Sequence, residues 1–182
     1  MLTLALLPDR LENLPKARQL LFAWLGWRHG GVVPLRKDIR PEDLRGAMAA
    51  VSVVDVDLPD RIIFRQYATI IAERTGHDRR GENALDMADP DDRLLRIERY
   101  RNLIKTPCGM IATQSIHLAD GSEFEVNLLM LPVATELNAE PGFVYISEDL
   151  TEHRDWREPS KIVTTPLAHD TAYIDIGRGV PV

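Results

Sequence analysis

At 182 residues the chain is long enough to bury one hydrophobic core and too short to form two comfortable domains. Its 45% hydrophobic and 27% charged residues are ordinary for a globular protein, and its net charge of −6 argues against a nucleic-acid surface, where a basic face would be expected. A single cysteine, Cys108, excludes an internal disulfide and favours a reducing compartment.

The apolar N-terminal stretch, residues 1–7, lacks a basic flank and is ended by Pro8. No run in the sequence approaches the ~20 apolar residues that span a bilayer. We therefore expect neither a signal peptide nor a membrane anchor, and we expect a cytoplasmic protein.

The first predicted element is a helix over roughly residues 14–29, with Pro15 in its first turn, Asn13 as its cap and Gly30 at its end. Its apolar surface is wider than a single core contact requires. One interpretation wedges the helix into its own domain, and the other also packs it on a second protomer, because large apolar patches on soluble proteins are rare unless they are used. The predicted dimer interface consists of Leu21, Phe22, Trp24 and Leu25.

Two strands are predicted over residues 51–58 and 61–67, followed by a short helix that ends at Gly76. Arg65 lies in the middle of the second strand, and a half-buried arginine needs a partner because an unpaired buried charge is costly. One interpretation pairs Arg65 with Asp55 or Asp57 on the neighbouring strand. The other makes Arg65 a bidentate anchor for an anionic ligand, with Tyr67 lining the same face.

A second long helix is predicted over residues 90–105, with Asp89 as its cap. Its expected buried side consists of Leu94, Ile97, Tyr100 and Ile104. The rest of the helix is basic, which is typical of a solvated face and leaves docking of an acidic partner as the alternative. The basic residues are Arg93, Arg96, Arg99 and Arg101.

Two long strands meet at the Asp120-Gly121 turn, and the hydrophobic pattern decides their register. A three-residue loop pairs Leu118 with Ser122 and separates apolar from polar side chains, whereas a two-residue loop mixes them. This register requires Gly121 to adopt a positive φ. The predicted apolar face then contains Met110, Ala112, Ile116, Leu118, Phe124, Val126, Leu128 and Met130.

A further strand over residues 142–148 completes the pattern, so the chain is expected to be an α+β domain with an antiparallel sheet. We expect an N-terminal helical segment over residues 1–32, a central domain over 33–150 and a polar C-terminal extension over 151–182. Whether that extension folds back is open.

The chain resembles the proteobacterial family of stand-alone PAS-domain proteins found alongside signalling kinases. The matching motifs are the tryptophan-bearing helix before Pro34-Leu35-Arg36-Lys37-Asp38-Ile39, then Phe64-Arg65-Gln66-Tyr67, and the strand from Glu125 to Pro132. The likeness covers roughly residues 15–150 and departs at Ala68, where the family usually has glycine. It implies a five-stranded sheet with helices on one face cupping a small pocket, and dimerisation through the N-terminal helix.

On this resemblance we expect a non-catalytic sensory or interaction module that binds a small ligand or a signalling partner such as a kinase. The expected ligand-binding residues are Arg65, Tyr67, Met110, Phe124, Leu128 and Met130. Two alternatives remain: a cone-shaped α+β enzyme of the ketosteroid-isomerase type, which needs a buried carboxylate or histidine facing its pocket, and a scaffold without a ligand.

The sequence names no cofactor. It contains no phosphate-binding glycine loop, CxxC pair, HExxH or GxSxG motif, and its five histidines lack close metal-ligand spacing. His77 or His117 could serve as an axial haem ligand in principle, although His117 falls on the polar face of its strand. The flavin-adduct cysteine motif of light-sensing PAS domains is absent, and Cys108 is expected to be structural.

Overall fold

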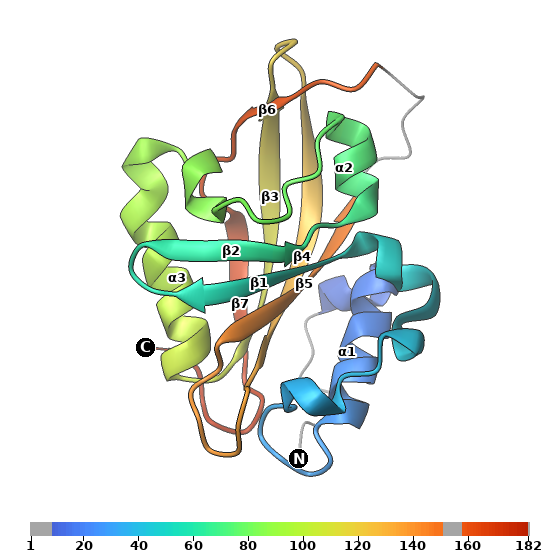
Figure 1. Ribbon diagram of the computed structural model, residues 1–182, viewed down its shortest axis with the longest axis vertical. Coiled ribbons are helices and arrows are strands. Elements are labelled where there is room, and N and C mark those ends of the chain that lie inside the picture. The colour runs from blue at the N-terminus through green and yellow to red at the C-terminus, as the bar shows by residue number, and fades with distance from the viewer. Residues whose placement is uncertain (1–8, 151–157, 182) are drawn as a thin grey trace.

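The computed structural model describes residues 9–150 and 158–181. Within them a seven-stranded antiparallel sheet has the order β2-β1-β5-β4-β3-β6, and β7 also pairs with β3 (Figure 1). The strands are β1 (Val51–Asp57), β2 (Arg61–Gln66), β3 (Gly109–Leu118), β4 (Glu123–Val133), β5 (Phe143–Leu150), β6 (Ile162–Thr164) and β7 (His169–Ile174). The N-terminal stretch 1–7 lies outside the described residues.

The predicted register of the β3–β4 hairpin is confirmed. Ile116 pairs with Phe124, and the Leu118 N–H donates to the Ser122 carbonyl at 2.9 Å. Gly121 has a φ of 80°, as the three-residue loop requires, because glycine reaches the left-handed region without a Cβ clash. Met110, Ala112, Ile116 and Val126 consequently lie in one buried cluster.

Helices cover both faces of the sheet. On one face lie α2 (Thr69–Thr75), the 3-10 turns η5 (Ala84–Met87) and η6 (Pro90–Asp92), and α3 (Arg93–Lys105). On the other lies α1 (Pro15–Trp27), with η2 (Asp9–Asn13), η3 (Arg36–Asp38) and η4 (Pro41–Ala50) preceding and following it. In Figure 1, α3 and α1 flank opposite sides of the strands. The α+β fold class is confirmed, with α1 on the face opposite α3. No described helix is long and apolar enough to cross a membrane.

The N-terminus of α1 is capped from across the molecule. Asn13 was the predicted cap, but the N-cap residue is Leu14 and no side chain of that position caps the helix, so the prediction is wrong. Instead, the backbone N–H groups of Lys16 and Ala17 donate to the two carboxylate oxygens of Asp149 on β5, at 3.2 and 2.9 Å. A carboxylate at a helix N-terminus satisfies otherwise unpaired donors and complements the helix dipole, so Asp149 ties α1 to the sheet.

The arginines of α3 do not form the expected solvated face. Arg93 donates to the Leu85 carbonyl at 2.8 Å, and Arg96 donates through Nη2 to the Thr165 carbonyl at 2.6 Å. Arg99 likewise bonds the Ala168 carbonyl. Of the four arginines, only Arg101 pairs on the surface, with Glu98. The predicted burial of Leu94 is also wrong: it is 76% exposed, because the helix presents Ile97, Tyr100, Leu103 and Ile104 to the core.

The C-terminal segment folds back and extends the sheet beyond the five predicted strands. Besides β6 and β7, its residues 165–168 cross the edge of the α3 layer, and we call residues 158–168 the strap. The Thr165 N–H donates to the Met87 carbonyl at 2.9 Å, and Gln114 donates to the Pro166 carbonyl at 2.6 Å.

The expected division of the chain at residues 32 and 150 stays a prediction. Ala68 has a φ of −58°, so its backbone needs no glycine.

Candidate functional site

A cavity of about 70 Å³ lies between the sheet and α3, and Ile162 and Thr165 of the strap contribute to its lining. Its lining combines aromatic and aliphatic side chains with a few polar groups. Of the predicted ligand-binding residues, Tyr67 and Leu128 line it. The lining consists of Phe64, Tyr67, Ala84, Met87, Arg96, Tyr100, Gln114, Ile116, Val126, Leu128, Ile146, Glu148, Ile162 and Thr165.

The other predicted ligand-binding residues lie elsewhere. Met110 and Met130 belong to the same buried cluster as the cavity but do not line it. Phe124 is partly buried near the hairpin tip, where the Arg74 guanidinium lies 5.2 Å from its ring centroid. These three residues fill the core and its rim, so the cavity is smaller than the predicted apolar face.

Arg65 does not line this cavity. Its side chain is 51% exposed and pairs with the Asp55 carboxylate on β1, with Arg65 Nε 3.1 Å from Oδ2. Phe64 and Tyr67 are buried and line the cavity, whereas Arg65 is an exposed neighbour of both. The ion-pair interpretation is therefore confirmed.

Glu148 is the acidic residue of the cavity. It is 7% exposed, and its Oε1 accepts a hydrogen bond from the Ser52 hydroxyl. The Ser52 oxygen itself accepts from the Ala68 N–H at 2.9 Å, so the single hydroxyl proton is free to point at Glu148. Burial raises the pKa of Glu148 to about 7, and the Ser52 hydrogen bond opposes part of that rise.

Three aromatic rings share the cavity with Glu148. Phe64 and Tyr67 meet edge to face, with centroids 4.9 Å apart and an interplanar angle of 73°. Burial raises the pKa of Tyr100 to about 12, and burial followed by the Glu148 charge raises the pKa of Tyr67, so both hydroxyls stay protonated at neutral pH. The cavity therefore combines two neutral phenol groups with a carboxyl group whose pKa is raised to about 7.

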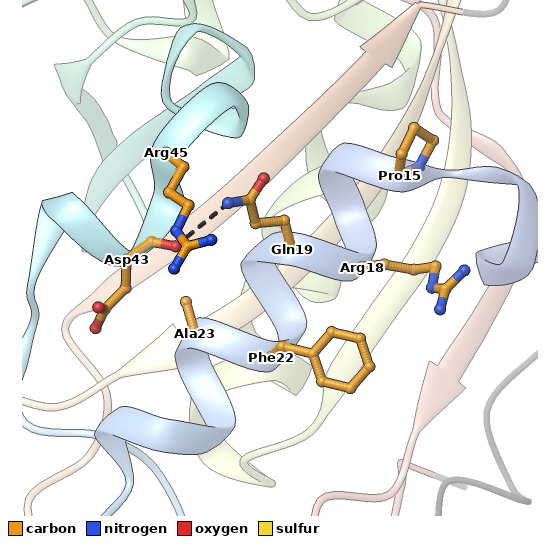
Figure 2. A pocket seen from close by; sticks show the side chains of 7 residues that line it. All are labelled: Pro15, Arg18, Gln19, Phe22, Ala23, Asp43 and Arg45. Atoms are coloured by element: carbon orange, nitrogen blue, oxygen red, sulfur yellow. Dashed lines mark hydrogen bonds between the residues drawn. The ribbon is translucent and has the colours of Figure 1, made fainter.

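A second hollow lies on the outside of the molecule, between α1 and η4, with a volume of about 420 Å³ (Figure 2). We call it the α1 groove. Figure 2 shows Phe22 pointing away from the helix, and Gln19 reaching the Asp43 carbonyl, which accepts its hydrogen bond at 3.4 Å. The groove is lined by Pro15, Arg18, Gln19, Phe22, Ala23, Asp43 and Arg45.

The predicted dimer residues divide between this surface and the core. Leu21 and Trp24 are 1% and 0% exposed within the protomer, and the Trp24 indole donates to the Pro132 carbonyl at 2.9 Å. They are therefore inaccessible to a second copy in this fold. Phe22 is 50% exposed, and Leu25 is half-buried. Of the four predicted interface residues, Phe22 is therefore the most exposed.

Arg45, which lines the groove, has a strained backbone conformation. Its φ of 43° and ψ of −122° lie in a region that non-glycine residues rarely adopt, and it divides η4 into two pieces. Its guanidinium has no hydrogen-bond partner among the residues that the structure describes.

The profile of the PAS domain family matches residues 13–144, which is more than half of the chain. The protein belongs to the PAS domain family. The LOV protein of Rhodobacter sphaeroides is a similar solved structure, with 16% identity, a TM-score of 0.45, and coverage of 75% of this chain and 69% of that chain. The RsLOV d2 variant is 18% identical with a TM-score of 0.43, covering 57% and 60%. No curated protein matches the chain.

The cavity of this PAS domain does not fit a large cofactor. Pockets for drug-sized ligands measure roughly 300–1,000 Å³, several times the volume of about 70 Å³ found here. His77 pairs with Glu82, and His117 lies 3.4 Å from Glu123 on the exposed side of its strand, so neither lines the cavity. Cys108 is fully buried outside the cavity lining, and burial raises the pKa of its thiol to about 12.

Glu148, Arg96 and Gln114 line the cavity but were not among the predicted ligand-binding residues. Glu148 carried a usable signal, because the period-two pattern of β5 puts it on the same face as Val144 and Ile146, in the middle of the buried side. Arg96 had no such signal. Its role depends on the strap, whose path over the cavity depends on tertiary contacts.

Proposed function

We propose that this PAS domain is a non-catalytic sensory module whose buried cavity binds a small ligand and whose α1 groove carries the response to a partner. The PAS family supports a sensory role. The observation that carries the proposal is the position of two adjacent β5 residues: Glu148 lines the cavity, and Asp149 caps α1.

Because successive strand residues point to opposite faces, β5 connects the two sites directly. Ser147 donates to Asp149 Oδ2 at 2.7 Å on the α1 side, while Ile146 and Glu148 line the cavity. A ligand that shifts Glu148 would shift the carboxylate that holds the first turn of α1. The response then reaches the groove, since Pro15 and Arg18 of that helix line it.

The proposed receiving surface is the α1 groove, and we propose a cytoplasmic homodimer joined there around Phe22. A signalling protein such as a kinase would contact the same helix. The half-exposed Phe22 supports a protein contact, because aromatic residues are enriched at protein–protein interfaces.

The coupling is tested by filling the cavity. Ala84 lines it and is 5% exposed, so Ala84→Leu occupies much of the free volume. Hydrogen exchange should then change at the amides of Lys16 and Ala17, because their acceptor belongs to the strand that lines the cavity. The matched control is Ala139→Leu at an exposed loop position. Unchanged exchange in α1 after filling the cavity would contradict the proposal.

A second candidate function is favoured by Glu148 alone. An enzyme of the ketosteroid-isomerase type needs a buried carboxyl group facing a pocket, and Glu148 meets that requirement. The small cavity argues against steroid-sized substrates. Deuterium exchange into acetone, a ketone of a few atoms, measures this activity: catalysis lost in Glu148→Gln would favour the enzyme over the sensor.

A further inference from the structure

Glu148 lacks a cationic partner. Its Oε1 accepts from Ser52, and neither Oε2 nor Oε1 pairs with a basic side chain anywhere in residues 9–150 and 158–181. Arg96 also lines the cavity, but its Nη2 is bonded to the Thr165 and Pro166 carbonyls, at 2.6 and 3.1 Å. An ionised carboxylate buried without a partner is costly, so something else must neutralise it.

Two species can neutralise the group: a proton or a small cation. Since the Ser52 hydroxyl donates to Oε1, the proton of the neutral acid belongs on Oε2. A cation with an N–H group could replace that proton at the same oxygen. A neutral ligand or an anion cannot replace that proton, so Glu148 would stay a neutral acid beside it.

The rings of the cavity favour a cation over other small ligands. Phe64, Tyr67 and Tyr100 all line the same 70 Å³ space as Glu148. Aromatic faces carry negative potential and attract ammonium groups within about 6 Å of the ring centre. A carboxylate combined with such rings is the chemistry that recognises organic ammonium ions.

We propose that the cavity binds a small organic ammonium ion of the methylammonium class, whose N–H donates to Glu148 Oε2 in place of the carboxyl proton. The inference rests on the proposed ligand-binding function and names its ligand class. Charge balances in the exchange: the neutral acid and the free cation give a carboxylate–ammonium pair and one proton released to solvent. Since about 10–15 Å³ of such space holds one water, the cavity of about 70 Å³ has room for a ligand the size of a few waters.

Among the charged and titratable groups around the cavity, Glu148 is the one that we expect to change its protonation state near neutral pH. Tyr67 and Tyr100 stay protonated because burial raises the pKa of each. Arg96 keeps its charge. Ser52 on β1, which donates to Glu148, is neutral, and so are the lining residues Gln114, Leu128 and Thr165 from β3, β4 and the strap. Behind Tyr67 lie Arg79 and Glu82, which pair with each other at 2.8 Å; His77 also contacts Glu82.

The test titrates the isotopically labelled full chain with methylammonium chloride and follows the amide resonances of Ser52, Tyr67 and Glu148. An alkylammonium stays charged at about pH 6 and about pH 8, since the lysine side chain has a pKa of about 10.4. With Glu148 half ionised near pH 7, we expect about tenfold tighter binding at the higher pH. Methanol, the neutral isostere, and potassium chloride at equal ionic strength should not bind.

Glu148→Gln keeps an oxygen for Ser52 and should abolish both binding and its pH dependence. Glu123→Gln, an exposed acidic position, is the matched control. If Glu148→Gln does not fold, Leu128→Phe blocks the cavity and should abolish binding instead. Equal affinity at both pH values, or binding retained in Glu148→Gln, overturns the proposal.

Two further probes, formate and acetate, separate this inference from the proposed function. If formate or acetate binds and methylammonium does not, the proposal of a cationic ligand is overturned. The protein would still be a ligand-binding sensor, with the unpartnered Arg96 Nε as the anchor. Failure of all these probes overturns the ammonium proposal. The sensory function fails as well only if Ala84→Leu also leaves the exchange of α1 unchanged.

Discussion

Glu148 makes the free energy of unfolding depend on pH. Its pKa is about 7 in the folded chain, against an ordinary value of 4.5, because burial disfavours the charged form. The folded state therefore holds the proton more tightly than the unfolded state does. The stabilising effect of the neutral acid is complete below about pH 4.5 and is lost as the pH rises through about 7.

Glu148→Gln should remove this dependence. Each pKa unit corresponds to about 1.4 kcal/mol, so the native chain should lose on the order of 3 kcal/mol between those limits through this residue. The amide cannot ionise, and the variant should be more stable than the native chain at the upper limit. Urea unfolding across the pH range measures the difference, and parallel profiles for the two proteins would refute it.

Arg45 also lowers the stability of the fold, because its backbone conformation is unfavourable for a residue with a Cβ. At a φ of 43° and a ψ of −122°, glycine would fit without a Cβ clash. We expect Arg45→Gly to raise the free energy of unfolding by about 1 kcal/mol. Arg45→Ala keeps the Cβ and should show no such gain. A destabilised glycine variant would mean that the Arg45 side chain contributes more than its backbone costs.

At the scale of elements, β5 matters most because its two faces serve different sites. Val144, Ile146 and Glu148 face α3, whereas Phe143 and Tyr145 pack with α1. α3 has a similar double role, since its apolar side fills the core and Arg96 and Arg99 hold the strap. Both elements therefore contact layers that are built from residues far apart in the sequence.

Removing the cap from β5 should loosen α1 selectively. Asp149→Ala leaves the N–H groups of Lys16 and Ala17 without acceptors, and lost N-caps cost about 1–2 kcal/mol. Asp149→Asn keeps one carbonyl oxygen and should lose less. Hydrogen exchange at these two amides should accelerate in the order native, Asn, Ala. Equal protection in all three would show that packing alone holds the helix.

At the scale of the whole molecule, the sheet separates two surfaces. The cavity lies between the sheet and α3, and the α1 groove lies on the opposite face. In the proposed function, a ligand bound on one side acts on a protein contact on the other through a movement of the sheet.

The contact is expected to depend on Phe22. Phe22→Asp places a charge on the half-exposed position and should convert a dimer into a monomer in light scattering after size exclusion. Leu94→Asp is the matched control, because Leu94 is 76% exposed on α3, away from the groove. A native chain that is monomeric at every concentration, or a Phe22→Asp dimer, would rule out this interface.

Local pattern alone determined the hairpin register at Gly121, the two long helices and the PAS resemblance, because side-chain periodicity and turn chemistry act between near neighbours. The same period-two rule applied to β5 would have placed Glu148 inside. Only the tertiary structure decided that Asp149 caps α1 and that Arg96 holds the strap. Those contacts join residues about 130 and 70 positions apart, and no local periodicity encodes which distant backbone group a charged side chain will meet.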